Sequence, residues 1–229
     1  MYNNKIDSYN LILNEQLKIS HSIKKYAKYA IDINSLFIKA IRIGDFKNVK
    51  YLIENGADIH INNDVALILS SKYGDLEIVK LLVEKGADIH VENEYPLIIS
   101  SIHGHDNIVE FLIQKGSNIH SLNERALTSA CINGHFEIVK ILVENGADIH
   151  TDGDIAFLYA CSFGYIEIVK YLINIGANIY ANNNIAFHTC CNKGYIEIIK
   201  LIINSDKNYL QNNKFAIKNM IEFNLFHLL

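Results

Sequence analysis

The stretch EIVKLLVEKGADIH, residues Glu77–His90, returns in altered form as NIVEFLIQKGSNIH at Asn107–His120 and as EIVKILVENGADIH at Glu137–His150. Each copy lies thirty residues after the one before it, without insertions. The same step separates the glycines of two series, Gly44, Gly74, Gly104, Gly134, Gly164 and Gly194, and Gly56, Gly86, Gly116, Gly146 and Gly176. A fixed period of this length is typical of repeat architectures, in which each unit stacks on its neighbours.

The apolar residues within one unit have a helical period. Leu76, Val79 and Leu82 would lie on one face of a helix that ends near Gly86, where glycine accommodates the left-handed conformation that terminates helices. A shorter helix, DVALILSSKY, precedes it and ends before the other glycine. Each unit is therefore predicted to be a helix, a tight turn, a second helix and a loop. We expect a polar residue to cap the first helix of successive units, namely Asp64, Glu94, Glu124, Asp154 and Asn184.

These units resemble the ankyrin repeat, which consists of a turn and two helices and carries a T-P-L-H-x-A signature. Tyr95-Pro96-Leu97-Ile98 is similar to this signature and has its proline, while Ile185-Ala186-Phe187-His188 keeps its histidine. The pairs Gly104-His105 and Gly134-His135 and the segment EIVKLLVEKGAD also match, and the resemblance spans residues 34–217. It implies an all-α ankyrin-repeat solenoid of stacked helix-turn-helix units. Because three residues of the family's pattern are missing from each loop, we expect short loops in place of long β-hairpins.

The register divides the chain into three parts. Residues 1–33 lie outside the repeat and are predicted to form an N-terminal helical cap, with a basic helix that docks on a membrane or a partner as the alternative. Residues 214–229 are predicted to form a partial C-terminal capping repeat. Between them lie six predicted repeats, 34–63, 64–93, 94–123, 124–153, 154–183 and 184–213.

Composition and charge argue against several functional classes. The net charge is −4 and lysines alternate with acidic residues, so the sequence offers no basic stripe for nucleic acid. No apolar run is long enough for a membrane span, and the first residues lack the apolar region of a secretory signal. A soluble cytoplasmic protein is therefore expected. Thirty-residue units rich in isoleucine and asparagine resemble the ankyrin repeats of giant amoebal viruses, of the mimivirus type, which implies a viral protein in the host cytoplasm or in the virion.

The histidines that close the repeated stretch could be metal ligands or structural residues. His60, His90, His120 and His150 share one register, which Tyr180 continues. In a stack they would lie about 8–10 Å apart, the separation of packed helices, whereas zinc holds its nitrogen ligands at about 2.0–2.1 Å. The resemblance implies hydrogen bonds within the loop and towards the next unit. The resemblance also places His105 and His135 at the start of the second helices, where we expect capping and loop hydrogen bonds. We predict neither a metal nor a cofactor.

The cysteines follow the same register logic. Cys131, Cys161 and Cys191 occupy the position of Ser71 and Ser101, where small residues would let first helices approach closely. Neighbouring units are too far apart for the Cα separation of about 4.4–6.8 Å that a disulfide needs. Buried structural thiols in a reducing compartment are therefore predicted.

No catalytic group converges in this pattern, because most polar residues fall in registers that caps, turns and solvated helix faces explain. We therefore predict that the chain is not an enzyme. The resemblance implies a scaffold for protein–protein interaction that binds a protein partner on its concave face. The registers there that vary between units give the candidate partner-binding residues Tyr73, Ile99, Ile102, Ile132, Tyr159 and Phe163. These side chains could instead fill gaps between short loops and helices.

Two other functions fit the sequence. A structural or self-assembling component, for instance in a virus particle, would use the apolar C-terminal segment with Leu225, Phe226 and Leu228 to form a homo-oligomer. Alternatively, that segment folds onto the sixth unit. An adaptor that brings substrates to a ubiquitin ligase is the weaker alternative, because no recruiting segment is recognisable after the repeats.

Overall fold

The computed structural model describes residues 32–206 and 208–225, and in these ranges the regular elements are helices, without a β-strand. The all-α prediction is therefore confirmed. The described residues fall into two compact parts, the N-terminal part, which ends at Ala87, and the C-terminal part, which begins at Asp88. Most of the predicted N-terminal cap, residues 1–31, lies outside the described residues.

The N-terminal part contains two pairs of helices. α3 (Ile33–Arg42) is followed by α4 (Phe46–Glu54), and α5 (Ile61–Tyr73) by α6 (Leu76–Glu84). α3 packs on α5 and α4 packs on α6, so that first helices form one layer and second helices another. The carboxylate of Asp32 caps α3 by accepting hydrogen bonds from the Asn34 N–H and the Ser35 hydroxyl.

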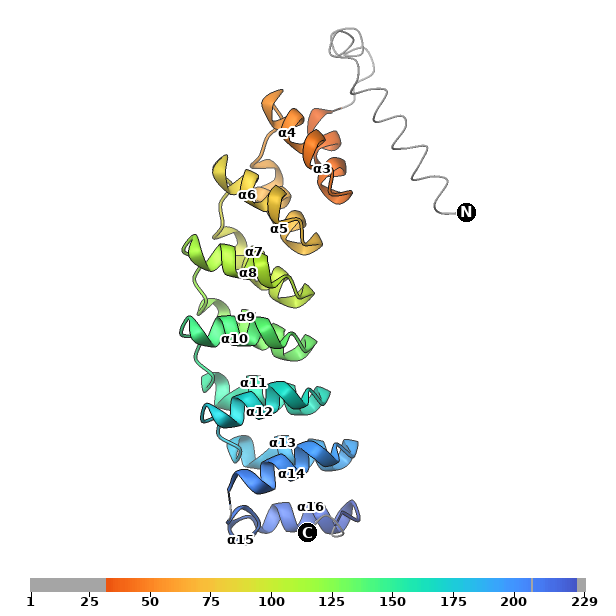
Figure 1. The fold of residues 1–229 in the computed structure, drawn as a ribbon, viewed down its shortest axis with the longest axis vertical. Coiled ribbons are helices and arrows are strands. Elements are labelled where there is room, and N and C mark those ends of the chain that lie inside the picture. Colours follow the sequence, from red (N-terminus) through yellow and green to blue (C-terminus); the bar gives the residue numbers. More distant parts are fainter. Residues whose placement is uncertain (1–31, 207, 226–229) are drawn as a thin grey trace, which may run out of the picture. The chain divides into compact units, whose positions relative to one another are not determined.

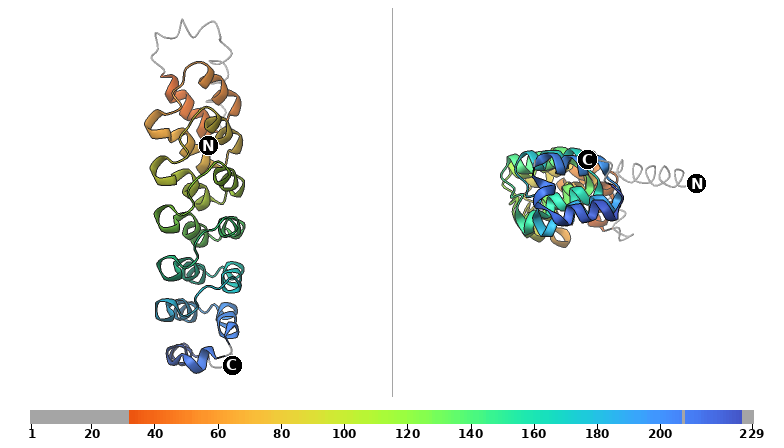
Figure 2. Two further views of the ribbon diagram at one scale, coloured as in Figure 1. Left: turned by 90° about the vertical axis from the view of Figure 1, so that its left-hand side faces the viewer. Right: turned by 90° about the horizontal axis from the view of Figure 1, so that it is seen from below.

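The C-terminal part has the same two layers. Its first helices are in contact in the order α7, α9, α11, α13 and α16, and its second helices in the order α8, α10, α12 and α14. In Figure 1 these are the green to blue helices, and Figure 2 shows them as two columns. The stacked helix-turn-helix units of the prediction are confirmed. The helices of the C-terminal part are α7 (Val91–His103), α8 (Asp106–Gln114), α9 (Ser121–Asn133), α10 (Phe136–Glu144), α11 (Thr151–Phe163), α12 (Ile166–Asn174), α13 (Ala181–Lys193), α14 (Ile196–Ser205), α15 (Tyr209–Asn212) and α16 (Lys214–Glu222).

Small side chains let the first helices approach one another. Ser101, Cys131 and Cys161 have no exposed surface, and each follows a residue that is equally buried. The Cys190 thiol donates a weak hydrogen bond to the carbonyl of Cys161 in the preceding unit at 3.7 Å. The register shared by serine and cysteine is therefore buried in the layer of first helices, as the sequence predicts.

The loops enter the first helices through a left-handed turn, and here one prediction needs correction. Asp152, Gly153 and Asp154 have φ angles of 50°, 69° and 60°, and residues 62–64, 92–94, 122–124 and 182–184 form the same turn. Asn, Asp and Gly adopt this conformation more readily than other residues, and it connects the units without a hairpin. The acids at the end of the turn were predicted to cap the first helix, but their carboxylates accept hydrogen bonds from the histidine four residues earlier.

Aromatic residues pack around the last loop of the C-terminal part. The Tyr180 hydroxyl donates a hydrogen bond to the Asp206 carboxylate, and its ring stacks on that of Tyr209 at a centroid distance of 5.1 Å. Tyr209 is fully buried, and its hydroxyl donates to Oδ1 of Asn184 at 3.2 Å. Together with burial, the contact with Asp206 raises the pKa of Tyr180 to about 12. These contacts take over the position where the earlier units have a histidine and an acid.

The C-terminal helix follows that loop. α16 packs on α13 as the first helix of a further unit would. Leu225 is buried, so this part of the apolar segment folds onto the helices, whereas Phe226 and Leu228 lie outside the described residues. None of the described helices has the length and apolarity needed to cross a membrane.

Leu122 is the apolar exception in the left-handed turns, and replacing it should stabilise the protein. It has a φ of 50° and is 58% exposed, while Asn182, in the same register, donates from Nδ2 to the Gly153 carbonyl at 2.9 Å. We expect Leu122→Asn to raise the free energy of unfolding by about 1 kcal/mol, since a left-handed residue other than Gly, Asn or Asp costs roughly 1–2 kcal/mol.

Urea unfolding followed by circular dichroism measures this difference. Leu122→Ala is the matched control, because it removes the exposed side chain and keeps the backbone cost. An Asn variant that is no more stable than the Ala variant would contradict the role assigned to the turn.

Candidate functional site

The residues predicted for partner binding differ in accessibility. Tyr73 ends α5 in the N-terminal part, and the other five residues lie on α7, α9 and α11 in the C-terminal part. Ile99 has only 6% of its surface exposed, so it offers almost nothing to a partner, contrary to the prediction. The reason is that this position of α7 is enclosed by the layer of first helices, as is Ser129 in the same register. Tyr73 and Phe163 are exposed, and the half-buried members of the set are Ile102, Ile132 and Tyr159.

Phe163 is the centre of an aromatic cluster at the end of α11. It is 48% exposed, and its ring lies 6.5 Å from the ring of Tyr159, one turn earlier on the same helix. On another side it stacks on Tyr165 at 6.3 Å with an interplanar angle of 23°. The ammonium of Lys193 lies 5.7 Å from the Phe163 ring centroid, within the range of a cation–π interaction. An accessible aromatic side chain is therefore held in place by three neighbours.

Tyr165 also belongs to a series of rings that join neighbouring units. The rings of His135, Tyr165 and Tyr195 each cover the glycine that ends the first helix of the unit before. A Cβ atom at Gly104 would lie 2.7 Å from Cε1 of His135. These glycines are thus needed for space as well as for their positive φ, which is 79° at Gly104.

Carbonyls near the ends of the first helices, which have no partner within the helix, can be satisfied by side chains of the next repeat. Nε2 of His135 hydrogen-bonds to the carbonyl of Ile102 at 3.0 Å. His135 is the N-cap residue of α10, as predicted, but its side chain makes no capping hydrogen bond there; of the two expected kinds of hydrogen bond, the imidazole makes the one outside its own helix. Two units later the ring is that of Tyr195, and Nζ of Lys193 donates to the corresponding carbonyl, Ser162, at 2.7 Å. Lys193 therefore connects the aromatic cluster to the backbone beneath it.

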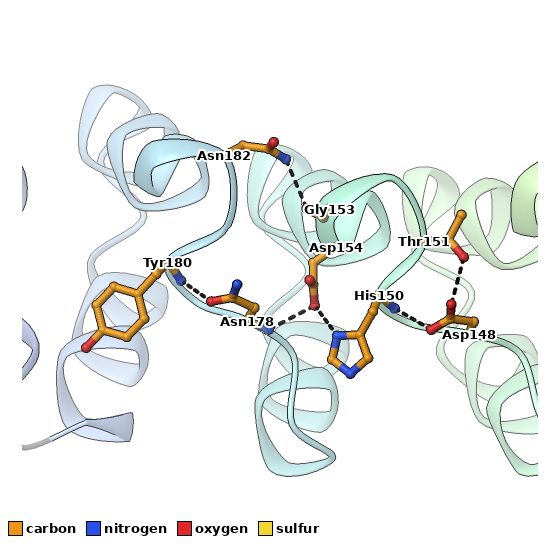
Figure 3. A network of polar contacts seen from close by, with 8 residues as sticks. All are labelled: Asp148, His150, Thr151, Gly153, Asp154, Asn178, Tyr180 and Asn182. Carbon is orange, nitrogen blue, oxygen red and sulfur yellow. Dashed lines mark hydrogen bonds and ion pairs between the residues drawn. The ribbon is translucent and has the colours of Figure 1, made fainter.

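The loop histidines are paired with buried acids. Nδ1 of His150 lies 3.1 Å from Oδ1 of Asp154, and the same oxygen accepts a hydrogen bond from the Asn178 N–H of the next loop at 2.8 Å (Figure 3). The pairs His60–Asp64, His90–Glu94 and His120–Glu124 repeat the contact at 3.0, 2.5 and 2.5 Å. The structural role predicted for this register is confirmed, within the loop and, at Asp154, towards the next unit.

The charge of one of these histidines depends on its acid. The hydrogen bond to Glu94 raises the pKa of His90 above its usual value of 6.5, opposed by desolvation and assisted by the negative charges of Glu94 and Asp88. The carboxylate of Glu94 is buried, whereas the His90 side chain is 56% exposed. Protonation of His90 would therefore provide a buried carboxylate with a positive partner.

The other groups that could support chemistry are dispersed or buried. Among the described residues, no three His, Cys, Asp or Glu side chains come together as a metal site would require. The four cysteines are free and buried, and burial raises the pKa of Cys131 to about 12. A thiol at such a position is a poor nucleophile, because the reactive form is the thiolate.

Sequence reasoning missed Tyr165 and Tyr195 as members of the ring series. It connected the two Gly-His pairs with the family pattern, but in the next two units tyrosine follows the glycine. The signal that could have found them was the shared position after glycine, read as a site for any planar ring. It also missed the pairing of each histidine with the acid four residues later, although the spacing is constant along the sequence.

Comparison with known proteins adds one finding. The family model described as ankyrin repeats (3 copies) matches residues 3–93, 67–152 and 149–214. These matches overlap and together cover most of the chain. No curated protein matches it.

Adding a methyl group at Gly104 should destabilise the protein through its contact with His135. We expect Gly116→Ala to cost roughly 1–2 kcal/mol, since Gly116 has a φ of 99° but nothing within 4 Å of the added Cβ. Gly104→Ala should cost roughly 1–3 kcal/mol more, because the imidazole must move. Urea unfolding measures both values.

A double-mutant cycle isolates that contact. In a His135→Ala background the ring is absent, so Gly104→Ala should then cost about as much as Gly116→Ala does. Equal costs of Gly104→Ala in both backgrounds would exclude the ring as the cause.

The His90–Glu94 pair should make stability depend on pH. Because the pKa of His90 is raised in the folded state, its stabilising contribution is fully present below its ordinary pKa of 6.5 and is lost as the pH rises through the folded value. We expect His90→Gln to lower the free energy of unfolding more under mildly acidic than under mildly alkaline conditions. In a Glu94→Gln background this pH dependence should be much smaller, because only the charge of Asp88 then still raises the pKa of His90. An undiminished pH dependence there would assign the effect to another group.

Proposed function

Because the chain belongs to the ankyrin-repeat family, whose members generally mediate protein–protein interactions and are typically not enzymes, we propose that it binds a partner protein through the concave side of its first-helix layer. The observation that carries this proposal is the exposed ring of Phe163, held by Tyr159, Tyr165 and Lys193. Exposed aromatic side chains with a polar rim are frequent anchors of protein interfaces.

The arrangement of the cluster favours binding by a preformed surface. Two of the three neighbours of Phe163 are held against the backbone, because Tyr165 is packed over Gly134 and Lys193 donates a hydrogen bond to the Ser162 carbonyl. A partner that covers the Phe163 ring would bury apolar area and order few side chains. The entropy lost on binding is thereby reduced.

Half-buried Ile102 and Ile132 lie two residues before the glycine in the two preceding repeats, in the register of Ser162 and one position before that of Phe163. The carbonyl of Ile102 is bound by His135, and both isoleucines expose less surface than Phe163. We assign them to the margin of the surface, with Phe163 as its anchor. Tyr73, in the N-terminal part, has an exposed ring beside Lys72, and we propose it as a separate contact with the partner protein.

The source and location of the protein are also part of the proposal. The isoleucine- and asparagine-rich units support an origin in a giant virus of amoebae, and with it an action on host proteins in the host cytoplasm. Proteins that co-purify with the tagged chain from amoebal lysate are the partners to test.

Removing the Phe163 ring should weaken partner binding strongly. We expect Phe163→Ala to raise the Kd of a purified captured partner by about 30-fold or more, as the loss of an interface anchor does. Isothermal titration calorimetry measures the Kd.

Ile175→Ala provides the matched control, since Ile175 is an exposed apolar residue of similar accessibility at the end of α12. It should leave the Kd unchanged. A Phe163→Ala variant that unfolds like the wild type and binds with the same Kd would place the partner on another surface.

A further inference from the structure

The charged side chains of the C-terminal part are distributed unequally between its two layers. Beyond their left-handed turns, the first helices α7, α9, α11 and α13 carry no carboxylate, and their permanent charges are those of Arg125 and Lys193. Exposed acids such as Glu92, Glu137 and Glu167 lie instead in the turns and on the second helices. A chain with a net charge of −4 thus has a first-helix layer whose permanent charges are positive.

Both cations are accessible, and neither has a carboxylate partner among the described residues. Arg125 is exposed directly after the left-handed turn of α9, and Lys193 is exposed at the end of α13. The ion pairs in the described ranges are formed by other lysines and by histidines. The ammonium of Lys193 contacts the Ser162 carbonyl and the Phe163 ring. Each cation is therefore available to a carboxylate of a partner.

An apolar stripe lies between these cations on α11, which packs on both α9 and α13. Ile155, Tyr159 and Phe163 follow one another at intervals of four residues, so they lie along one side of the helix. Phe163 is exposed, and the other two are half-buried. An apolar stripe with a positive charge near either end is complementary to a ligand that is apolar in the middle and acidic at both ends.

We propose that the first-helix layer binds an extended segment of the partner protein in which apolar residues separate two acids, one placed at Arg125 and the other at Lys193. The inference rests on the proposed function, because Phe163 belongs to the same surface. It adds the chemistry of the ligand. Charge complementarity at both ends would fix the register of the segment and favour acidic over basic partners.

The stack sets the spacing of the two acids. Lys193 has the register of Asn133, which follows Arg125 by eight positions on α9, and this corresponds to a rise of about 12 Å along the helix axis. Two helix separations of about 8–10 Å each lie between α9 and α13. The two Cα atoms are therefore about 20–23 Å apart, a distance that an extended chain spans in about six or seven residues.

Fluorescence anisotropy with labelled synthetic peptides tests the proposal on the full chain. The acidic probe has Asp at both ends of a stretch of leucine and proline, which disfavours a helix, with the two acids about seven residues apart. The neutral probe has Asn in place of both. The wild type should bind the acidic probe about tenfold more tightly than the neutral probe, and added salt should reduce this difference.

Charge reversal tests where the acids bind. Arg125→Glu and Lys193→Glu should each raise the Kd of the acidic probe about thirtyfold, because one of its acids then faces a like charge. For each variant, one of the two probes that carry Lys at one end should return the Kd to within about threefold of the wild-type value. Lys170→Glu is the matched control for net charge, since Lys170 is exposed on the second helix α12, and it should leave the Kd unchanged.

Two results would overturn the proposal. One is a wild type that binds the acidic and neutral probes equally, and the other is a pair of charge-reversed variants that bind the acidic probe as Lys170→Glu does. Circular dichroism and urea unfolding show whether any variant has lost its fold.

A failure of the partner-binding proposal is recognised separately with Phe163→Ala. This change should weaken both probes by a similar factor, because it removes an apolar contact. If it alters neither Kd, Phe163 is not the anchor, whereas the difference between the acidic and neutral probes still reports on the two cations.

Discussion

The left-handed turn that opens α5, α7, α9, α11 and α13 is the constraint on which these repeats depend. Three successive residues with positive φ change the direction of the chain in so few residues that the period can be thirty. They also place an acid at the end of the turn, where it is buried next to the following helix. A buried carboxylate needs a partner, and the histidine four residues earlier supplies it. The loop composition, the recurring histidine and the short period thus have one physical origin.

Contacts between units use a different solution on the opposite edge of each unit. There the first helix ends in a glycine, and at Gly104, Gly134 and Gly164 the missing Cβ leaves room for a ring of the next repeat. Imidazole in this place also binds the free carbonyl of Ile102, whereas at Ser162 the carbonyl receives its hydrogen bond from Lys193. The shape of the contact is therefore constant, but its hydrogen bond can come from different residues. The hydrogen-bond donor can vary because any planar ring of suitable size fills the space over the glycine.

Much of the fold follows from the sequence, because the period, the helical spacing and the glycines all depend on interactions inside one unit or between identical registers. The buried cysteines and the structural histidines could be predicted for the same reason. The accessibility of single side chains could not. Ile99 and Tyr159 share a register, yet one is buried and the other half-buried, because accessibility depends on the side chains that neighbouring units present. The partner of the acids was also missed, since a helix cap and a turn give an acid the same place in the sequence.

The aromatic cluster shows how a binding surface can arise from such a stack without disturbing it. Tyr165 covers Gly134 and also stacks on Phe163, so the ring that supports the exposed Phe163 also makes a contact that holds two repeats together. Phe163 itself covers no glycine and fills no part of the core, and its replacement therefore removes surface without removing a unit contact. A Tyr165 variant would change both. Specificity can then vary at the residue before the glycine while the residue after it maintains the stack, which separates the positions that determine binding from those that determine stability.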